Sequence, residues 1–339
     1  MVTVEEVRNA YRLIFGREPE NEKVLIHHAQ QGHSLEELGQ KFLSSPEFCR
    51  SSRASVPQRP LNWPPIEVEV DASDLQRSAM MRHVEANWHN LGLADPHWSV
   101  LTNEAYRASN IVRTEEHFYE SGKPHIERLR RTAERCGIGL TEFKRCFELG
   151  CGVGRLSIWL ADLFGEVVAA DISPAHLALA QQALDRFERT NVNLVHLDSF
   201  GALEAIPEFD VFISIIVLQH NPPPLIAATL KTVLTRLRPG GIAYFQVPTY
   251  RTKYRFRIDE YLSNASPTRG MEMHLIPQHL LFDILRQAGC QLLECREDGS
   301  TGNYDTISNS ILARKQEHSA STVRRRHASS GRSGSRRGT

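Results

Sequence analysis

The sequence predicts an α/β protein preceded by a small all-helical module. Short apolar runs alternate with helical segments from residue 143 to residue 313, which is typical of a parallel sheet with helices on both faces. The first 50 residues show helical patterns only, and a proline-rich stretch separates the two parts. A length of 339 residues is enough for about two domains.

The composition is that of an ordinary globular protein, with 41% hydrophobic and 24% charged residues. The longest apolar run, 211–218, is interrupted by Ser214 and falls short of the roughly 18–20 residues that span a bilayer. The N-terminus lacks the basic-then-apolar order of a signal peptide. We therefore expect a cytoplasmic protein without a membrane span.

The six cysteines argue against a zinc ribbon or a redox motif, because no two of them form a C-x-x-C pair. We interpret most of them as small buried residues in a reducing compartment. No metal site is expected.

The zero net charge is unevenly distributed along the chain. Residues 314–339 hold eight of the 40 basic residues and one of the 40 acidic residues, so the rest of the chain is mildly acidic. An acidic body argues against a nucleic-acid partner. Residues 316–339 contain Ser, Arg and Gly with almost nothing apolar, and we expect this tail to be disordered.

The helical module is expected to cover residues 1–50. Thr3 and Glu6 have the spacing of a capping box before a first amphipathic helix. A second helix is expected over 19–31, and a third begins at Ser34. We expect the module to contribute an interaction surface for a protein partner.

A linker is expected over residues 51–74, because four prolines within 51–66 favour extended chain. The main domain is then expected over 75–315. Its predicted strands are the apolar runs 147–149, 167–172, 192–197, 211–216, 242–247, 291–295 and 307–313. Helical patterns lie between them at 156–163, 173–184, 225–237 and 280–288.

The most informative stretch is FELGCGVGR at 147–155, which follows the first strand and opens a helix. Three glycines allow a tight turn and a close approach of a ligand to the backbone. A ligand at this point lies at the carboxyl end of the strand, the usual crevice of an open α/β sheet. A nicotinamide site needs glycine where Arg155 stands, and a P-loop needs Gly-Lys followed by Ser or Thr.

Acidic residues close the next two strands. Asp171 ends the second strand, where a carboxylate can accept hydrogen bonds from both ribose hydroxyls of a nucleoside. Asp198 and Ser199 end the third strand, where an acid can accept from an adenine amino group. A glycine turn after the first strand, followed by acids at the ends of the second and third strands, predicts a nucleoside-containing ligand.

Together, ELGCGVG, the two acid-ended strands, FDVFIS…VLQH and LRPGGIAYF resemble the class I S-adenosylmethionine-dependent methyltransferases over about residues 115–313. The resemblance implies a Rossmann-like seven-stranded sheet with an antiparallel last strand, and S-adenosyl-L-methionine as cofactor. The first fifty residues, with FGREP and SPEF, resemble a small bacterial helical domain of unknown function. That domain often accompanies enzymes of surface glycan assembly.

The resemblance also implies a set of cofactor-binding residues. The glycine turn would line the methionine and ribose, Asp171 would hold the ribose, and Ile172 would pack on adenine. Asp198 with Ser199 would bind the adenine edge, Glu148 would orient the turn, and Tyr119 would lie over the cofactor. The whole set is Tyr119, Glu148, Gly150, Cys151, Gly152, Gly154, Asp171, Ile172, Asp198, Ser199 and Ile215.

Methyl transfer to an oxygen also releases a proton, which a positioned histidine can accept. His220, just after the fourth strand, and His274 are the candidates for this catalytic role. The structural alternatives are that His220 caps the strand-to-loop turn and that His274 is a core or surface residue.

Aromatic and basic residues are interleaved within 249–275, where acceptor loops usually lie in this family: Tyr250, Arg251, Tyr254 and Arg255. They could stack on a sugar, grip an acidic acceptor or belong to a solvated helix face. We therefore expect a methyltransferase that acts on a glycan or small-molecule hydroxyl. The alternatives are a protein or RNA methyltransferase, and a cofactor-binding interaction protein without transferase activity.

Overall fold

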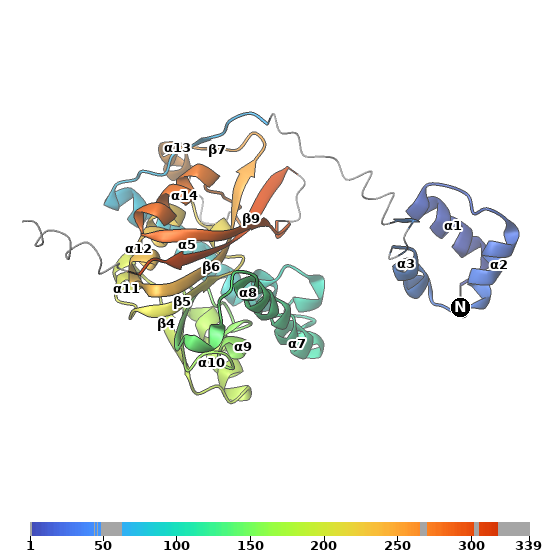
Figure 1. The fold of residues 1–339 in the computed structure, drawn as a ribbon, viewed down its shortest axis with the longest axis horizontal. Coiled ribbons are helices and arrows are strands. Elements are labelled where there is room, and N and C mark those ends of the chain that lie inside the picture. Colours follow the sequence, from blue (N-terminus) through green and yellow to red (C-terminus); the bar gives the residue numbers. More distant parts are fainter. Residues whose placement is uncertain are drawn as a thin grey trace, which may run out of the picture. The chain divides into compact units, whose positions relative to one another are not determined.

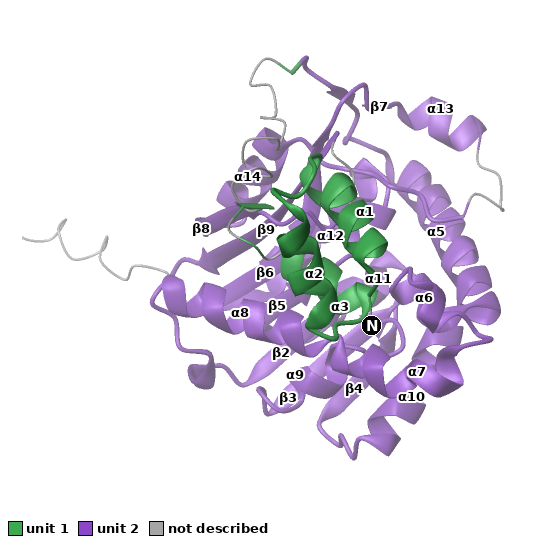
Figure 2. Ribbon diagram, turned by 90° about the vertical axis from the view of Figure 1, so that its right-hand side faces the viewer, with its two compact units in different colours: residues 1–63 green, residues 64–339 purple. Residues whose placement is uncertain are grey.

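The computed structural model describes residues 2–43, 45, 47–48, 63–264, 270–301 and 305–317. The chain divides into two compact units, residues 1–63 and residues 64–339, which are coloured separately in Figure 2. Each unit has its own hydrophobic core. They are described in turn.

The first unit contains the three predicted helices: α1 (Val4–Phe15), α2 (Glu22–Gln30) and α3 (Leu35–Leu43). The capping box is present, since Thr3 Oγ1 accepts from the Glu6 N–H and the Glu6 carboxylate accepts from the Thr3 N–H. Val2 and the buried side chains of the three helices form one small core: Val2, Val7, Ala10, Tyr11, Leu25, Leu38 and Phe42.

The FGREP and SPEF motifs meet in this unit. Arg17 donates from Nε and Nη2 to the two carboxylate oxygens of Glu47, at 2.7 and 2.8 Å. Nη2 also donates to Glu20 at 2.7 Å, and the guanidinium lies 5.3 Å from the ring centroid of Tyr11. The motifs thus tie the segment after α3 to the turn after α1.

The second unit is built on a seven-stranded sheet with the order β4-β3-β2-β5-β6-β9-β8. The strands are β2 (Arg145–Leu149), β3 (Glu166–Asp171), β4 (Val192–His196), β5 (Phe209–Ser214), β6 (Leu237–Arg251), β8 (Cys290–Glu297) and β9 (Thr306–Lys315). β9 runs antiparallel to both of its neighbours, and β2 to β6 are mutually parallel. This is the predicted Rossmann-like sheet with an antiparallel last strand.

Helices cover both faces of this sheet (Figure 1). Alternation along β2 explains why, since Phe147 packs on one face and Cys146 on the other. One face carries α11 (Phe200–Glu204), α12 (Pro223–Arg236) and α14 (Gln278–Gln287). The other carries α8 (Lys123–Arg135) and α9 (Ser157–Leu160), and next to these lie α7 (Ile111–Glu120) and α10 (Pro174–Arg186).

Folded structure begins earlier than the predicted boundary at residue 75. Residues 51–62 of the predicted linker lie outside the described residues, but β1 (Glu67–Val68) pairs in parallel with β7 (Arg255–Phe256). Val68 packs into an apolar cluster that also contains Phe256. The end of the predicted linker is therefore part of the second unit.

Two helices follow β1 and lead to the site. They are α5 (Asp74–Ala94), which starts with a capping box between Ser73 and Gln76, and α6 (Pro96–Val100). α5 packs against α10, α12 and α13 (Ile258–Ser263). No described helix combines the length and apolarity that a membrane crossing requires. The predicted disordered tail is described only at residues 316 and 317.

Candidate functional site

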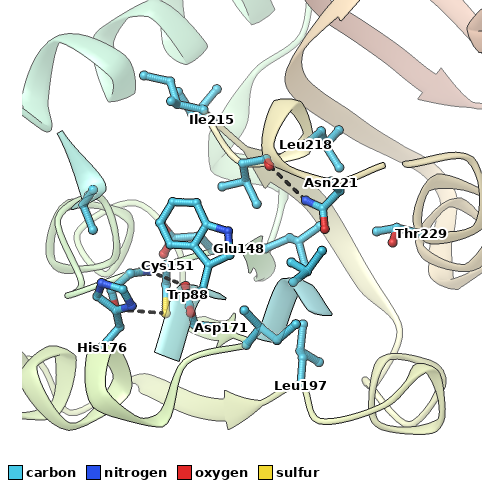
Figure 3. A pocket seen from close by; sticks show the side chains of 18 of the residues that line it. Trp88, Glu148, Cys151, Asp171, His176, Leu197, Ile215, Leu218, Asn221 and Thr229 are labelled. Atoms are coloured by element: carbon cyan, nitrogen blue, oxygen red, sulfur yellow. Dashed lines mark hydrogen bonds between the residues drawn. The ribbon is translucent and has the colours of Figure 1, made fainter. Parts of the chain in front are cut away.

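A cavity lies at the carboxyl ends of β2, β3 and β5, with a volume of about 1120 Å³ when the open solvent at its mouth is included. Figure 3 shows the side chains of 18 of the residues that line it. They come from α5 and α6, from the glycine turn after β2, from the end of β3, and from the segments that follow β4 and β5. This is the crevice that the sequence predicted for a ligand.

The glycine turn forms the floor of the cavity. The N–H groups of Gly150 and Cys151 both donate to Ala170 O, at 2.7 and 3.0 Å. Gly150 and Gly152 have φ angles of 75° and 54°. A Cβ at Gly150 would lie 2.3 Å from a methyl group of Val217, and one at Gly152 would lie 2.6 Å from a methyl group of Val100. Glycine is therefore required at both positions.

Gly154 has a different role from the one predicted. It is absent from the described cavity lining and packs on α10, where an added Cβ would lie 3.4 Å from Ala180 Cα. Its φ of 83° lies in the left-handed region, which favours glycine. Gly154 thus lets the turn approach the helix instead of the ligand.

The carboxylate of Asp171 borders the cavity next to the turn. Its Oδ2 accepts from the Gly152 N–H at 2.8 Å, and its Oδ1 accepts from the Ser173 N–H at 2.9 Å. A carboxylate has about four lone-pair sites, so each oxygen can accept a second hydrogen bond. Asp171 can therefore hold the turn and receive ligand hydroxyls together.

Glu148 and Arg155 are buried charged groups in the lining. Ser157 Oγ donates to Glu148 Oε2 at 2.5 Å, which ties β2 to the start of α9, directly after the glycine turn. The predicted role of Glu148 in orienting the turn stays a prediction. Burial raises the pKa of Glu148 to about 7. Arg155 donates to the Ser121 carbonyl at 3.1 Å, and burial lowers the pKa of its guanidinium to about 10.

Cys151, Ile172 and Ile215 line the cavity as predicted. Asp198 and Ser199 are absent from the described lining, although their neighbours Leu197 and Phe200 belong to it. Ser199 caps α11 by accepting from the Ala202 N–H at 3.2 Å, and it donates to Asp198 at 2.8 Å. The adenine contact of this exposed pair stays a prediction.

Tyr119 lies behind the glycine turn and is absent from the described cavity lining. It is buried, and its hydroxyl donates to the Val153 carbonyl at 3.2 Å. Trp159 Nε1 donates to the Tyr119 carbonyl at 2.8 Å. The lead-in helix α7 therefore supports the turn from its outer side, since Tyr119 packs among aromatic rings there.

Hydrogen bonds of known direction determine which ring nitrogen of His220 carries the hydrogen. The Ile216 N–H donates to Gln246 Oε1 at 3.0 Å, so Gln246 Nε2 is the donor to Gln219 Oε1 at 3.1 Å. Gln219 Nε2 then donates to His220 Nε2 at 3.2 Å. His220 Nδ1–H donates to the Glu272 carbonyl at 2.8 Å. Both ring nitrogens are therefore engaged.

This chain of bonds argues against His220 as the general base. Burial lowers the pKa of His220 to about 4, and its ring is absent from the described cavity lining. A base needs a free lone pair within reach of the acceptor proton. The geometry instead fits the structural alternative, in which His220 fastens the turn after β5 to the loop at Glu272.

His274 is engaged as well. Its Nδ1 is 2.8 Å from the Tyr254 hydroxyl, and its Nε2 is 3.1 Å from Glu272 Oε2. Although burial opposes the effect, hydrogen bonds from His274 and Tyr261 lower the pKa of Glu272 to about 2. His274 is also absent from the described lining, which corrects its predicted catalytic placement.

The interleaved aromatic and basic residues of 249–275 do not form a solvated helix face. Tyr254 is buried, with Arg251 stacked 4.7 Å from its ring centroid. Arg255 pairs with Glu260 at 2.9 Å, and Tyr250 donates to the Pro64 carbonyl at 2.8 Å. Tyr250 thus joins the segment to residue 64, whereas Arg251 and Arg255 contact residues of the segment itself.

The cavity also contains residues that sequence reasoning missed. Trp88 of α5, Ser99 and Val100 of α6, and His176 of α10 all line it. Ser99 Oγ and His176 Nε2 are 2.8 Å apart, which fastens α6 to α10. Residues 88 and 99 carry no motif, and helix packing alone brings them to the glycine turn.

Part of the second unit is similar to a known protein family. Residues 147–243, from β2 into β6, match a family model described as a methyltransferase domain. Over these residues the chain is similar to methyltransferase domains. The match lies within the part of the chain whose sequence resembles the S-adenosylmethionine-dependent methyltransferases.

Several curated relatives are similar to part of the chain. The ubiquinone biosynthesis O-methyltransferase of Ruegeria pomeroyi is 30% identical over 152 residues, which is 43% of this chain and 60% of the relative. The protein of the same name from Pseudomonas fluorescens is 31% identical over 154 residues, 43% of this chain and 63% of the relative. The chain thus spans about three-fifths of these relatives' length.

Solved structures include the magnesium protoporphyrin IX methyltransferase of Synechocystis with bound S-adenosylhomocysteine. It is 16% identical, covers 70% of this chain and 100% of that chain, and has a TM-score of 0.49.

Proposed function

We propose that this protein binds S-adenosyl-L-methionine in the cavity above the glycine turn and transfers its methyl group to an oxygen of a small molecule. The observation that carries the proposal is the Asp171 carboxylate, which borders the cavity while the Gly152 and Ser173 N–H groups hold it in place. That arrangement suits the two hydroxyls of a ribose.

The lining fits the cofactor in two further respects. The backbone at Gly150 and Gly152 is open to close approach, since no Cβ stands there. Two buried polar atoms in the lining, Arg155 Nε and His176 Nδ1, have no hydrogen-bond partner among the described residues. A polar ligand would satisfy such atoms, which are costly to leave unpaired.

When bound, the cofactor supplies a methyl group on a sulfonium leaving group, so the protein mainly aligns the acceptor and excludes water. Asp171 holds the nucleoside hydroxyls, and the glycine turn allows the backbone to meet the ligand. α5 and α6 cover the cavity, and the Ser99–His176 hydrogen bond keeps α6 in place over Gly152. Arg155 supplies a positive charge at the edge of the site.

We further propose an acidic hydroxyl, such as a phenol, as the acceptor. His220 and His274 use their ring nitrogens on other protein groups, so the proposal does not rely on a histidine base. A phenol loses its proton near pH 10 and needs less help than a sugar hydroxyl. The relatives' name, O-methyltransferase, favours the same acceptor atom. Glycan acceptors, a cytoplasmic location and a protein partner for the first unit stay predictions from the sequence.

Calorimetry with the cofactor and with its demethylated product tests the binding step. We expect both to bind the full chain, and the absence of heat with either would refute the proposal. Incubation with methyl-labelled cofactor and parallel sets of phenols, sugars, peptides and RNA then tests the acceptor. Label on phenols supports the proposal, whereas label confined to another set refutes the acceptor class. Binding without any transfer would favour an interaction protein.

A further inference from the structure

Trp88 lies over the centre of the cavity. Its ring centroid is 5.2 Å from that of His220, which follows β5, and 6.2 Å from that of His176, which follows β3. In the sheet, β2 lies between β3 and β5. An indole that reaches side chains on both sides must therefore stand over the carboxyl end of β2, where the glycine turn is.

The covalent structure of the cofactor then decides which of its groups Trp88 meets, an argument that rests on the proposed function. With the ribose at Asp171, the adenine extends toward Leu197 and Phe200, which follow β4. The sulfonium is attached at the opposite end of the ribose. It therefore extends toward β2 and β5, beneath the indole of Trp88.

The indole is held in position by close packing of α5. A Cβ at Gly92, one turn after Trp88, would lie 2.7 Å from Ser173 Oγ, so α5 is seated against the start of α10. Ser99 fixes the next helix to the same place through His176. Figure 3 shows Trp88 among the lining side chains, with Cys151 and Asp171 in the same view.

We propose that the indole face of Trp88 binds the sulfonium cation and makes the pocket discriminate the charged cofactor from its neutral product. A cation over the face of tryptophan is attracted by the ring, most strongly when water is excluded. The product S-adenosylhomocysteine carries no charge on sulfur and loses this attraction. Trp88 lies outside the matched residues 147–243, so this part of the site belongs to the segment before them.

The test is the ratio of the two affinities, measured by calorimetry on the full chain. Trp88→Leu keeps an apolar side chain but removes the ring, and should weaken S-adenosylmethionine binding roughly three- to thirtyfold more than S-adenosylhomocysteine binding. Trp88→Phe should retain most of the preference. Trp98→Leu is the matched control, because that ring stacks on the Arg107 guanidinium at 3.7 Å and is absent from the described lining.

An equal loss for both ligands in Trp88→Leu would overturn the inference and leave Trp88 as a passive wall. An unchanged ratio with unchanged affinities would overturn it as well. If the unmodified protein bound neither ligand, the proposed function itself would fail, and the inference with it. Circular dichroism of each variant separates these outcomes from a loss of folding.

Discussion

Asp171 Oδ2 and the backbone nitrogen of Gly152 are 2.8 Å apart, so the ligand-facing carboxylate also holds the glycine turn. The same side chain accepts from Ser173 at the start of α10. Loss of Asp171 must therefore affect two properties at once, the stability of the fold and the affinity for a nucleoside.

We predict that Asp171→Ala lowers the free energy of unfolding by about 2–4 kcal/mol, because two buried N–H groups lose a charged acceptor. Affinity for the cofactor should fall at least about tenfold. Denaturant unfolding and calorimetry measure the two effects. Asp185→Ala is the control, an exposed aspartate elsewhere on α10 that should change neither. Normal cofactor affinity in Asp171→Ala would remove it from the ribose role.

Gly152→Ala should destabilise the protein by about 1–3 kcal/mol, since the new Cβ meets Val100 in a crowded site. Gly137→Ala is a matched control, with a similar positive φ of 70° and open space around it, and should lose about 1 kcal/mol. Adding Val100→Ala to Gly152→Ala should restore part of the lost stability in thermal unfolding. Failure of this rescue would show that α6 does not press on the turn.

The buried carboxyl of Glu148 should make stability depend on pH. Its pKa in the folded protein is raised to about 7, whereas an unfolded glutamate titrates near 4.5. The folded state therefore binds more protons between these pH values, so stability falls as pH rises from about 4.5 to 7. The full effect is about 3 kcal/mol.

Glu148→Gln should remove this dependence while keeping the size of the side chain. We expect the variant to gain stability relative to the unmodified protein at pH 8 but not at pH 4.5, as measured by urea unfolding at both pH values. A difference that is the same at both pH values would contradict the assignment.

His220→Ala should lower the stability by about 1–3 kcal/mol, because Gln219 and the Glu272 carbonyl lose buried partners. Methyl transfer per folded molecule should fall less than about tenfold, and its pH profile should keep its shape. A loss of 10²-fold or more in a folded variant, typical of a general base, would restore the catalytic role.

Much of the site could be predicted because its parts stand next to strand ends. The glycine turn and Asp171 each follow an apolar strand directly, and parallel strands bring their carboxyl ends together. Local spacing is enough for such residues. Ile172 and Ile215 were found for the same reason.

The rest depends on contacts between distant segments. Trp88 and Ser99 reach the cavity only because α5 and α6 pack on α10. His220 has the right position in sequence, but the hydrogen bond from Gln246 to Gln219, across 27 residues, sets which nitrogen of His220 accepts from Gln219. The sequence alone does not show that Tyr254 is buried, because its hydrogen bond to His274 spans 20 residues.

The position of α5 and α6 in the sequence has a practical consequence for the choice of fragment boundaries. A recombinant fragment limited to the matched residues 147–243 would keep Asp171 and the glycines. It would lack α5 and α6, which cover the cavity. It would also lack both β1 and β7, which pair with each other, and the sheet strands β8 and β9. A fragment that begins at residue 64 keeps α5 and α6. Ligand added before proteolysis should protect these two helices from cleavage.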